Sequence, residues 1–66
     1  MTLWMLTNLA GRVLACCVTE DASGALVLTL AIEGEAILAE THYGELQVRE
    51  RARGLRSTMS GWEQTR

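Results

Sequence analysis

The chain has 66 residues, of which 48% are hydrophobic and none is proline, and its formal net charge is −2. The hydrophobic content excludes a disordered chain, and the small net charge gives no sign of a polyanionic partner. The length fits a single domain over residues 1–66 with a small core, since a chain of this size buries only about 60% of its unfolded surface.

The apolar residues at the start of the chain do not have the form of a secretory signal. No basic residue precedes Arg12, and Arg12 itself interrupts the apolar run. No run reaches the roughly 18–20 apolar residues of a membrane span. We therefore expect a cytoplasmic protein without membrane contact.

Short runs in which apolar residues alternate with other residues predict four strands in the first two thirds of the chain. Their expected ranges are 3–7, 12–19, 25–32 and 35–41. Gly11, Gly24 and the pair Glu33-Gly34 mark the turns between them. Such short connections favour an antiparallel meander.

The pair Glu33-Gly34 predicts a two-residue turn, which fixes a register for the last two strands. Leu30 then faces Ile37, and Leu28 faces Ala39. One face of the sheet would carry the large aliphatic residues Leu26, Leu28, Leu30, Ile32, Ile37 and Ala39. This face needs a cover.

After residue 42 the apolar period changes from two to a helical spacing. Val48, Ala52, Leu55, Met59 and Trp62 follow one another in steps of four, three, four and three. This stripe predicts a helix over residues 43–60 that covers the aliphatic face, with Leu55 as its central contact. The fold expected is therefore α+β: a four-stranded antiparallel β-meander followed by one C-terminal α-helix packed on one sheet face (ββββα).

The end of this helix has a recognisable signal. Gly61 fits the left-handed residue that follows a helix, and Trp62 would fold back on Leu55 or Met59.

The residues that carry chemistry are few. Cys16 and Cys17 are adjacent on a predicted strand, so their side chains point to opposite faces and do not pair; we expect both to be buried, reduced and inert. His42 is the only histidine, and it is predicted at a corner far from the cysteines. Glu33 and Glu35 flank an exposed turn. We therefore expect no catalytic residue, no cofactor and no metal.

Arg49, Arg53 and Arg56 are spaced four and three residues apart, so they share a stripe of the predicted helix. Such a row could contact phosphates, which indicates nucleic-acid binding as one function. The other interpretation is a solvated helix face, with Glu45 paired to Arg49 and Glu50 to Arg53. The acidic net charge favours the solvated face, so nucleic-acid binding is the alternative function.

The second face of the sheet is the other candidate surface. It would carry Val27, Ala31, Ala36 and Leu38, and one helix covers only one face of a sheet. An exposed apolar face of this kind favours a symmetric dimer, formed either sheet on sheet or by exchanged helices. We therefore expect a small non-enzymatic interaction protein that acts as a homodimer or as a subunit of a larger assembly, with another copy of itself or another protein as its partner.

Overall fold

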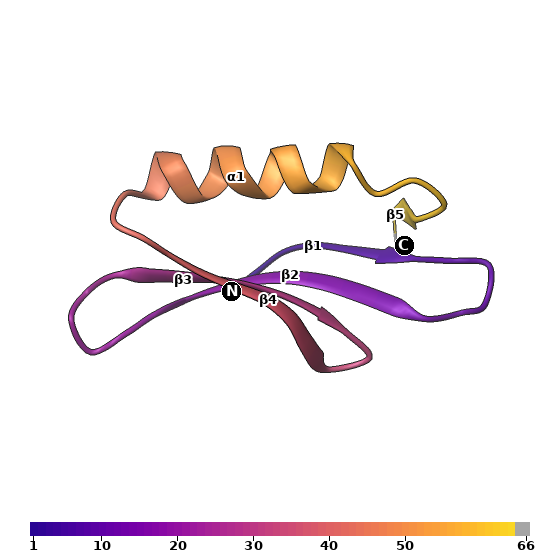
Figure 1. Ribbon diagram of the computed structural model, residues 1–66, viewed down its shortest axis with the longest axis horizontal. Coiled ribbons are helices and arrows are strands. Elements are labelled where there is room, and N and C mark those ends of the chain that lie inside the picture. The colour runs from indigo at the N-terminus through magenta and orange to yellow at the C-terminus, as the bar shows by residue number, and fades with distance from the viewer. Residues whose placement is uncertain (65–66) are drawn as a thin grey trace.

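The four strands and the helix form as the periodicity predicts. The computed structural model describes residues 1–64 and contains an antiparallel meander with α1 on one side of it (Figure 1). The elements are β1 (Thr2–Thr7), β2 (Val13–Glu20), β3 (Leu26–Ile32), β4 (Glu35–His42) and α1 (Glu45–Ser57). A short strand that the sequence did not indicate, β5 (Glu63–Gln64), pairs with β1, so the sheet order is β4-β3-β2-β1-β5.

The predicted turn residues take the conformations that the hairpins require. Glu33 and Gly34 both have positive φ, at 51° and 81°, which is the geometry of a type I′ turn. Gly11 has a φ of 79°, and its amide donates to the Asn8 carbonyl at 3.0 Å. Both hairpins therefore close where the sequence places them.

The register of β4 differs from the prediction beyond Ala36. Ile32 faces Glu35 and Ala31 faces Ala36, but Leu30 then faces Leu38 because a bulge makes Ile37 an extra residue. A shift of one residue exchanges the two faces of a strand. The expected positions of Ala39 on the covered face and of Leu38 on the opposite face were therefore wrong, and Ile37 is 56% exposed instead of packed against Leu30.

The core lies between α1 and the sheet. Its buried side chains are Leu6, Leu14, Cys16, Val18, Leu28, Leu30, Val48 and Ala52. The predicted helix stripe faces the sheet, but its most buried members are Val48 and Ala52, while Leu55 is only half-buried. The centre of the contact therefore lies nearer the start of α1 than expected.

The helix is shorter than the predicted 43–60. It ends at Ser57 with Thr58 as its C-cap, so Gly61 does not directly follow it. Gly61 does have a positive φ of 81°, in a turn where the Trp62 amide donates to the Met59 carbonyl at 3.4 Å. This turn brings the chain back to β1, where β5 pairs.

One ion pair ties α1 to β4. The guanidinium of Arg51 donates to both carboxylate oxygens of Glu40, at 2.9 and 2.8 Å, and the His42 ring lies 3.1 Å from the same carboxylate. These hydrogen bonds lower the pKa of Glu40 to about 2, and those from Arg51 have a larger effect than the one with His42. This network fixes α1 on the β4 side of the covered face.

Candidate functional site

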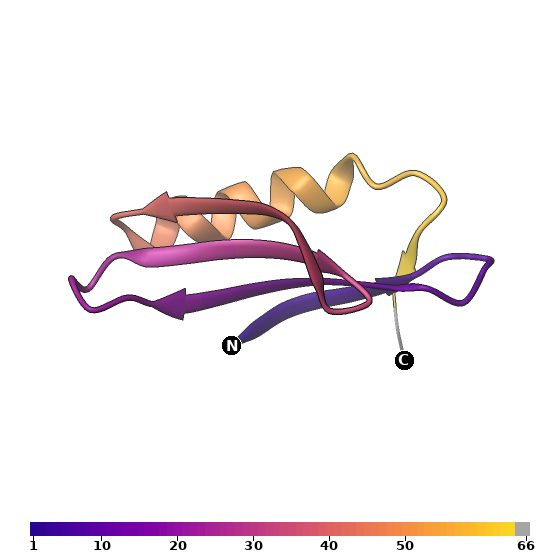
Figure 2. The same cartoon turned by 60° about the horizontal axis from the view of Figure 1, so that its bottom comes forward.

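The structure leaves one face of the sheet without a cover. No helix or strand within residues 1–64 lies over it, as two views of the ribbon show (Figures 1 and 2). We call this surface the open sheet face. By register it consists of Thr2, Met5, Thr7, Val13, Ala15, Cys17, Thr19, Val27, Thr29, Ala31, Ala36, Ala39 and Thr41.

The open sheet face carries small, uncharged side chains. Every member is half-buried or exposed, and none is an Asp, Glu, Lys, Arg or His. Near the β3–β4 turn, Met5, Ala15, Ala31 and Ala36 form one row across four strands. Three of the four side chains in this row are therefore single methyl groups.

Three of the four residues predicted for a dimer face lie on this surface. Val27, Ala31 and Ala36 belong to the open sheet face. Leu38 does not, because the bulge at Ile37 turns it toward the core, where it packs against the buried cluster. The sequence thus indicated the right face but one wrong member.

The two cysteines differ in environment. Cys16 is fully buried in the core, and burial raises the pKa of its thiol to about 11. Cys17 points to the open sheet face and is half-buried, with its sulfur 3.6 Å from the Thr2 hydroxyl. The expectation that both are buried was therefore wrong for Cys17.

A groove runs between α1 and β1 on the covered side. It forms because α1 packs mainly over β3 and β4, so the β1 side of the sheet is less covered. We call it the α1–β1 groove. Its middle is lined by Leu3, Trp4, Arg49, Ala52, Arg53 and Arg56, and it continues toward Leu6, Ser57 and Trp62.

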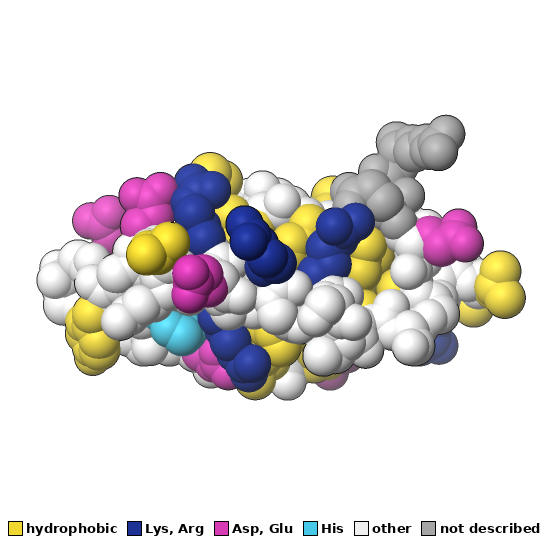
Figure 3. Space-filling view, turned by 90° about the horizontal axis from the view of Figure 1, so that it is seen from above, with side chains coloured by type: hydrophobic (Ala, Val, Ile, Leu, Met, Phe, Trp, Pro, Cys, Tyr) yellow, Lys and Arg dark blue, Asp and Glu magenta, His cyan; other side chains and the backbone are white. Residues whose placement is uncertain are grey.

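The predicted arginine row is one rim of this groove. Arginine side chains gather over α1 with hydrophobic surface between them (Figure 3). Arg49 pairs with Glu45 at 3.1 Å, as expected, but both side chains are largely exposed. The expected pairing of Glu50 with Arg53 is not present, and Arg53 makes no ion pair with any residue of the described part of the chain.

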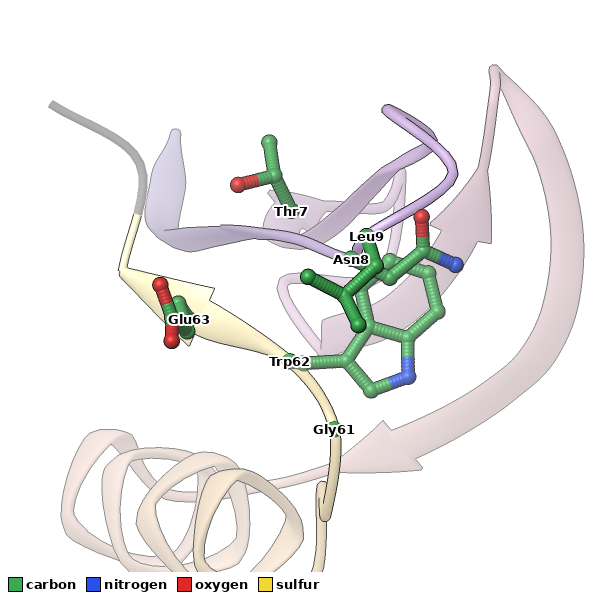
Figure 4. A pocket seen from close by; sticks show the side chains of 6 residues that line it. All are labelled: Thr7, Asn8, Leu9, Gly61, Trp62 and Glu63. Carbon is green, nitrogen blue, oxygen red and sulfur yellow. The ribbon is translucent and has the colours of Figure 1, made fainter.

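Two tryptophans mark the length of the groove. The indole N–H of Trp4 donates to the Ala52 carbonyl at 3.1 Å, which fixes the ring between β1 and α1. Trp62 lies farther along, beside Leu9 and Asn8 of the β1–β2 turn (Figure 4). No pattern in the sequence indicates that Trp4 adjoins the arginine row, since they are about 50 residues apart and only the sheet–helix packing joins them.

The remaining polar groups form no metal-binding cluster among residues 1–64. Glu33 and Glu35 stay exposed at the β3–β4 turn, and His42 is engaged with Glu40. No helix in the described part of the chain is long and apolar enough to cross a membrane.

Comparisons with known proteins identify no relative of this chain. No protein family, curated protein or solved structure matches this chain.

Proposed function

We propose that the protein is a small interaction protein that acts as a homodimer, with the open sheet faces of two copies packed against each other. The observation that carries this proposal is that a whole sheet face is uncharged and uncovered while the opposite face is packed by α1. A second copy is the occupant that removes this face from water.

The composition of the face suits a symmetric partner. A two-fold axis brings identical side chains close together, so a charged residue near the axis would meet its own charge. The four-strand row of Met5, Ala15, Ala31 and Ala36 contains no charge, and its three alanines allow close approach of two sheets.

The size of the face indicates a weak interface. Four strands spaced about 4.8 Å apart and about seven residues long give a footprint of roughly 450 Å². Two copies would bury roughly 900 Å² in total, less than the roughly 1,200–2,000 Å² of a stable interface. We therefore expect a weak dimer that exchanges with the monomer.

Light scattering and sedimentation equilibrium over a range of concentrations test the proposal. The mass should rise from that of one chain to that of two as the concentration increases. Ala31→Glu places a charge in the four-strand row of the face and should hold the protein at the monomer mass. Ala10→Glu adds the same charge at an exposed position of the β1–β2 turn and should leave the dimer unchanged.

Circular dichroism of each variant checks that it folds, and Thr29→Arg provides a second charged substitution on the same face. A monomer mass at every concentration for the unmodified protein would overturn the proposal. It would also be overturned by a dimer that persists in the folded Ala31→Glu and Thr29→Arg variants.

A further inference from the structure

The outer edge of β4 is open. β4 is the last strand on its side of the sheet, and no other strand within residues 1–64 lies beyond it (Figure 2). Gln64, the last described residue, lies on β5 at the opposite edge. An unpaired strand edge offers backbone N–H and C=O groups to an incoming strand.

The hydrogen bonds of the sheet identify which residues of β4 offer these groups. The amide of Glu33 donates to the carbonyl of Val13 at 2.9 Å, which sets the alternation of the β2–β3 ladder. In this alternation Leu28 directs its backbone groups to β4, where its partner is Glu40. The backbone of Glu40 therefore bonds to β3, and the residues on either side of it direct their groups outward.

These two residues are Ala39 and Thr41. Both are exposed, and each presents one N–H and one C=O group at the edge. They follow the bulge at Ile37, so the open edge is regular over residues 38–42, and about five residues suffice for a strand. A charge on an edge strand commonly opposes strand addition, but the carboxylate of Glu40 is already bound by Arg51 at 2.9 and 2.8 Å.

A second copy of the chain does not suit this edge. Two copies that use all four outward groups pair Ala39 of one copy with Thr41 of the other, and this register sets Glu40 directly opposite the Glu40 of the other copy. Like charges in this position destabilise a strand pair. The occupant is therefore a different polypeptide, so this edge is independent of the proposed dimer.

The side chains of β4 on the covered side select the charge of that polypeptide. They include two carboxylates, those of Glu35 and Glu40. Arg51 compensates Glu40, whereas Glu35 is exposed and makes no ion pair within residues 1–64. Side chains of an added strand alternate between the two sides of the sheet. Basic residues suit the covered side of that strand, and β-branched residues suit the side that lies beside Ala39 and Thr41.

We propose that a short extended polypeptide segment, in which basic residues alternate with β-branched residues, adds to the β4 edge as a further strand. The backbone groups of Ala39 and Thr41 position the segment through hydrogen bonds. Its basic side chains lie on the covered side, where one of them pairs with Glu35.

Fluorescence anisotropy with labelled peptides tests this site on the full-length chain. The probe is a peptide of about eight residues that alternates Lys and Val, long enough for one strand. We expect saturable binding that is lost when all backbone amides of the peptide are N-methylated, because the methyl groups remove the donors that bond to the edge. The same peptide with Glu in place of Lys should bind about tenfold more weakly or less.

Amide hydrogen exchange locates the bound strand. The amides of Ala39 and Thr41 should exchange about tenfold more slowly or less at saturating peptide than in the free protein, because they become hydrogen-bonded. The amide of Glu40 bonds to β3 in both states and should change little. Unchanged exchange at Ala39 and Thr41, or protection of Val27 and Ala31 instead, would overturn the proposal.

Two matched protein variants test the charge selection. Glu35→Lys should weaken binding of the Lys–Val peptide about tenfold, since it reverses the charge beside the basic residues. Glu20→Lys makes the same change at an exposed position at the end of β2 and should leave binding unchanged. Absence of saturable binding, equal binding of the N-methylated peptide, or equal loss in both variants would contradict the site.

Discussion

Cys16 and Cys17 show how a single step along a strand changes the chemistry of a side chain. Adjacent residues of β2 point to opposite faces, so one thiol enters the core and the other reaches the open sheet face. Only the thiolate form of a cysteine reacts readily, and burial disfavours that form in Cys16. The two thiols should therefore be separable by reactivity.

We predict that the Cys17→Ser protein, which keeps Cys16, does not react with Ellman's reagent near pH 8 until it is denatured. The Cys16→Ala protein keeps Cys17 and should react in its native state, more slowly at concentrations that favour the dimer. Rapid native reaction of Cys16 would show that the core face opens readily.

Glu40 of β4 forms an ion pair with Arg51 of α1. Its carboxylate titrates near pH 2 in the folded protein, against 4.5 for an unperturbed glutamate. Between these values the unfolded chain binds more protons than the native protein, so the free energy of unfolding falls as the pH is lowered through this window. Above about pH 4.5 the stabilisation is fully present.

We predict that Glu40→Gln destabilises the protein at neutral pH, and that the difference from the unmodified protein shrinks as the pH falls from 4.5 toward 2. Urea denaturation curves at a series of pH values measure this difference. Glu35→Gln, on the same strand but exposed and without an ion pair among residues 1–64, should show no such convergence. A constant difference across the window would contradict the role of the Arg51 pair.

At the scale of elements, the bulge in β4 decides which residues meet the helix. A regular hairpin would have placed Ile37 and Ala39 under α1, whereas the bulge places Leu38, Glu40 and His42 there. This shift brings the Glu40 carboxylate to the side of the strand where Arg51 reaches it. The bulge therefore places Glu40 where it can pair with Arg51 of α1.

Deleting Ile37 should test this account. The deletion leaves Glu35 opposite Ile32 and Leu38 opposite Leu30, so the ladder becomes regular and the rest of β4 keeps its faces. We expect a folded protein with a small change in stability. Deleting Ala39 instead makes the ladder regular only if Ile37 and Leu38 exchange faces, which turns Leu38 out of the core and should lower stability more. Thermal denaturation of both proteins compares them. Equal damage by the two deletions would contradict the register.

The contact between α1 and the sheet is concentrated at Val48 and Ala52. Val48 is 2% exposed, whereas Leu46, two residues earlier, is 70% exposed. We predict that Val48→Ala lowers the free energy of unfolding by about 1–3 kcal/mol, through lost burial and a cavity. Leu46→Ala should change it by no more than about 0.5 kcal/mol. Denaturation curves of the two variants decide this, and the reverse order would mean that α1 is docked on its other face.

At the scale of the whole molecule, the sheet separates two surfaces of different character. The open sheet face is uncharged, and the α1–β1 groove is rimmed by arginine. A 66-residue chain has a small core, so burial of the open face between two copies should contribute measurably to stability.

We predict that the thermal unfolding midpoint of the protein rises with its concentration, because dimerisation stabilises only the folded state. Calorimetry at a low and a high concentration measures the shift. Ala31→Glu should remove the dependence, and Ala10→Glu should retain it. A midpoint independent of concentration in the unmodified protein would indicate a monomer over the range tested.

The sequence alone determined the order and type of the main elements, because the change from period two to a helical period is local and strong. It also determined the turn at Glu33-Gly34 and the arginine row, since both depend on residues close together in the chain. The bulge at Ile37, the pairing of β5 with β1, and the meeting of Trp4 with Arg49 and Arg53 were decided only by the tertiary structure. Each depends on packing between segments distant in the sequence, and residue spacing along the chain carries no information about that packing.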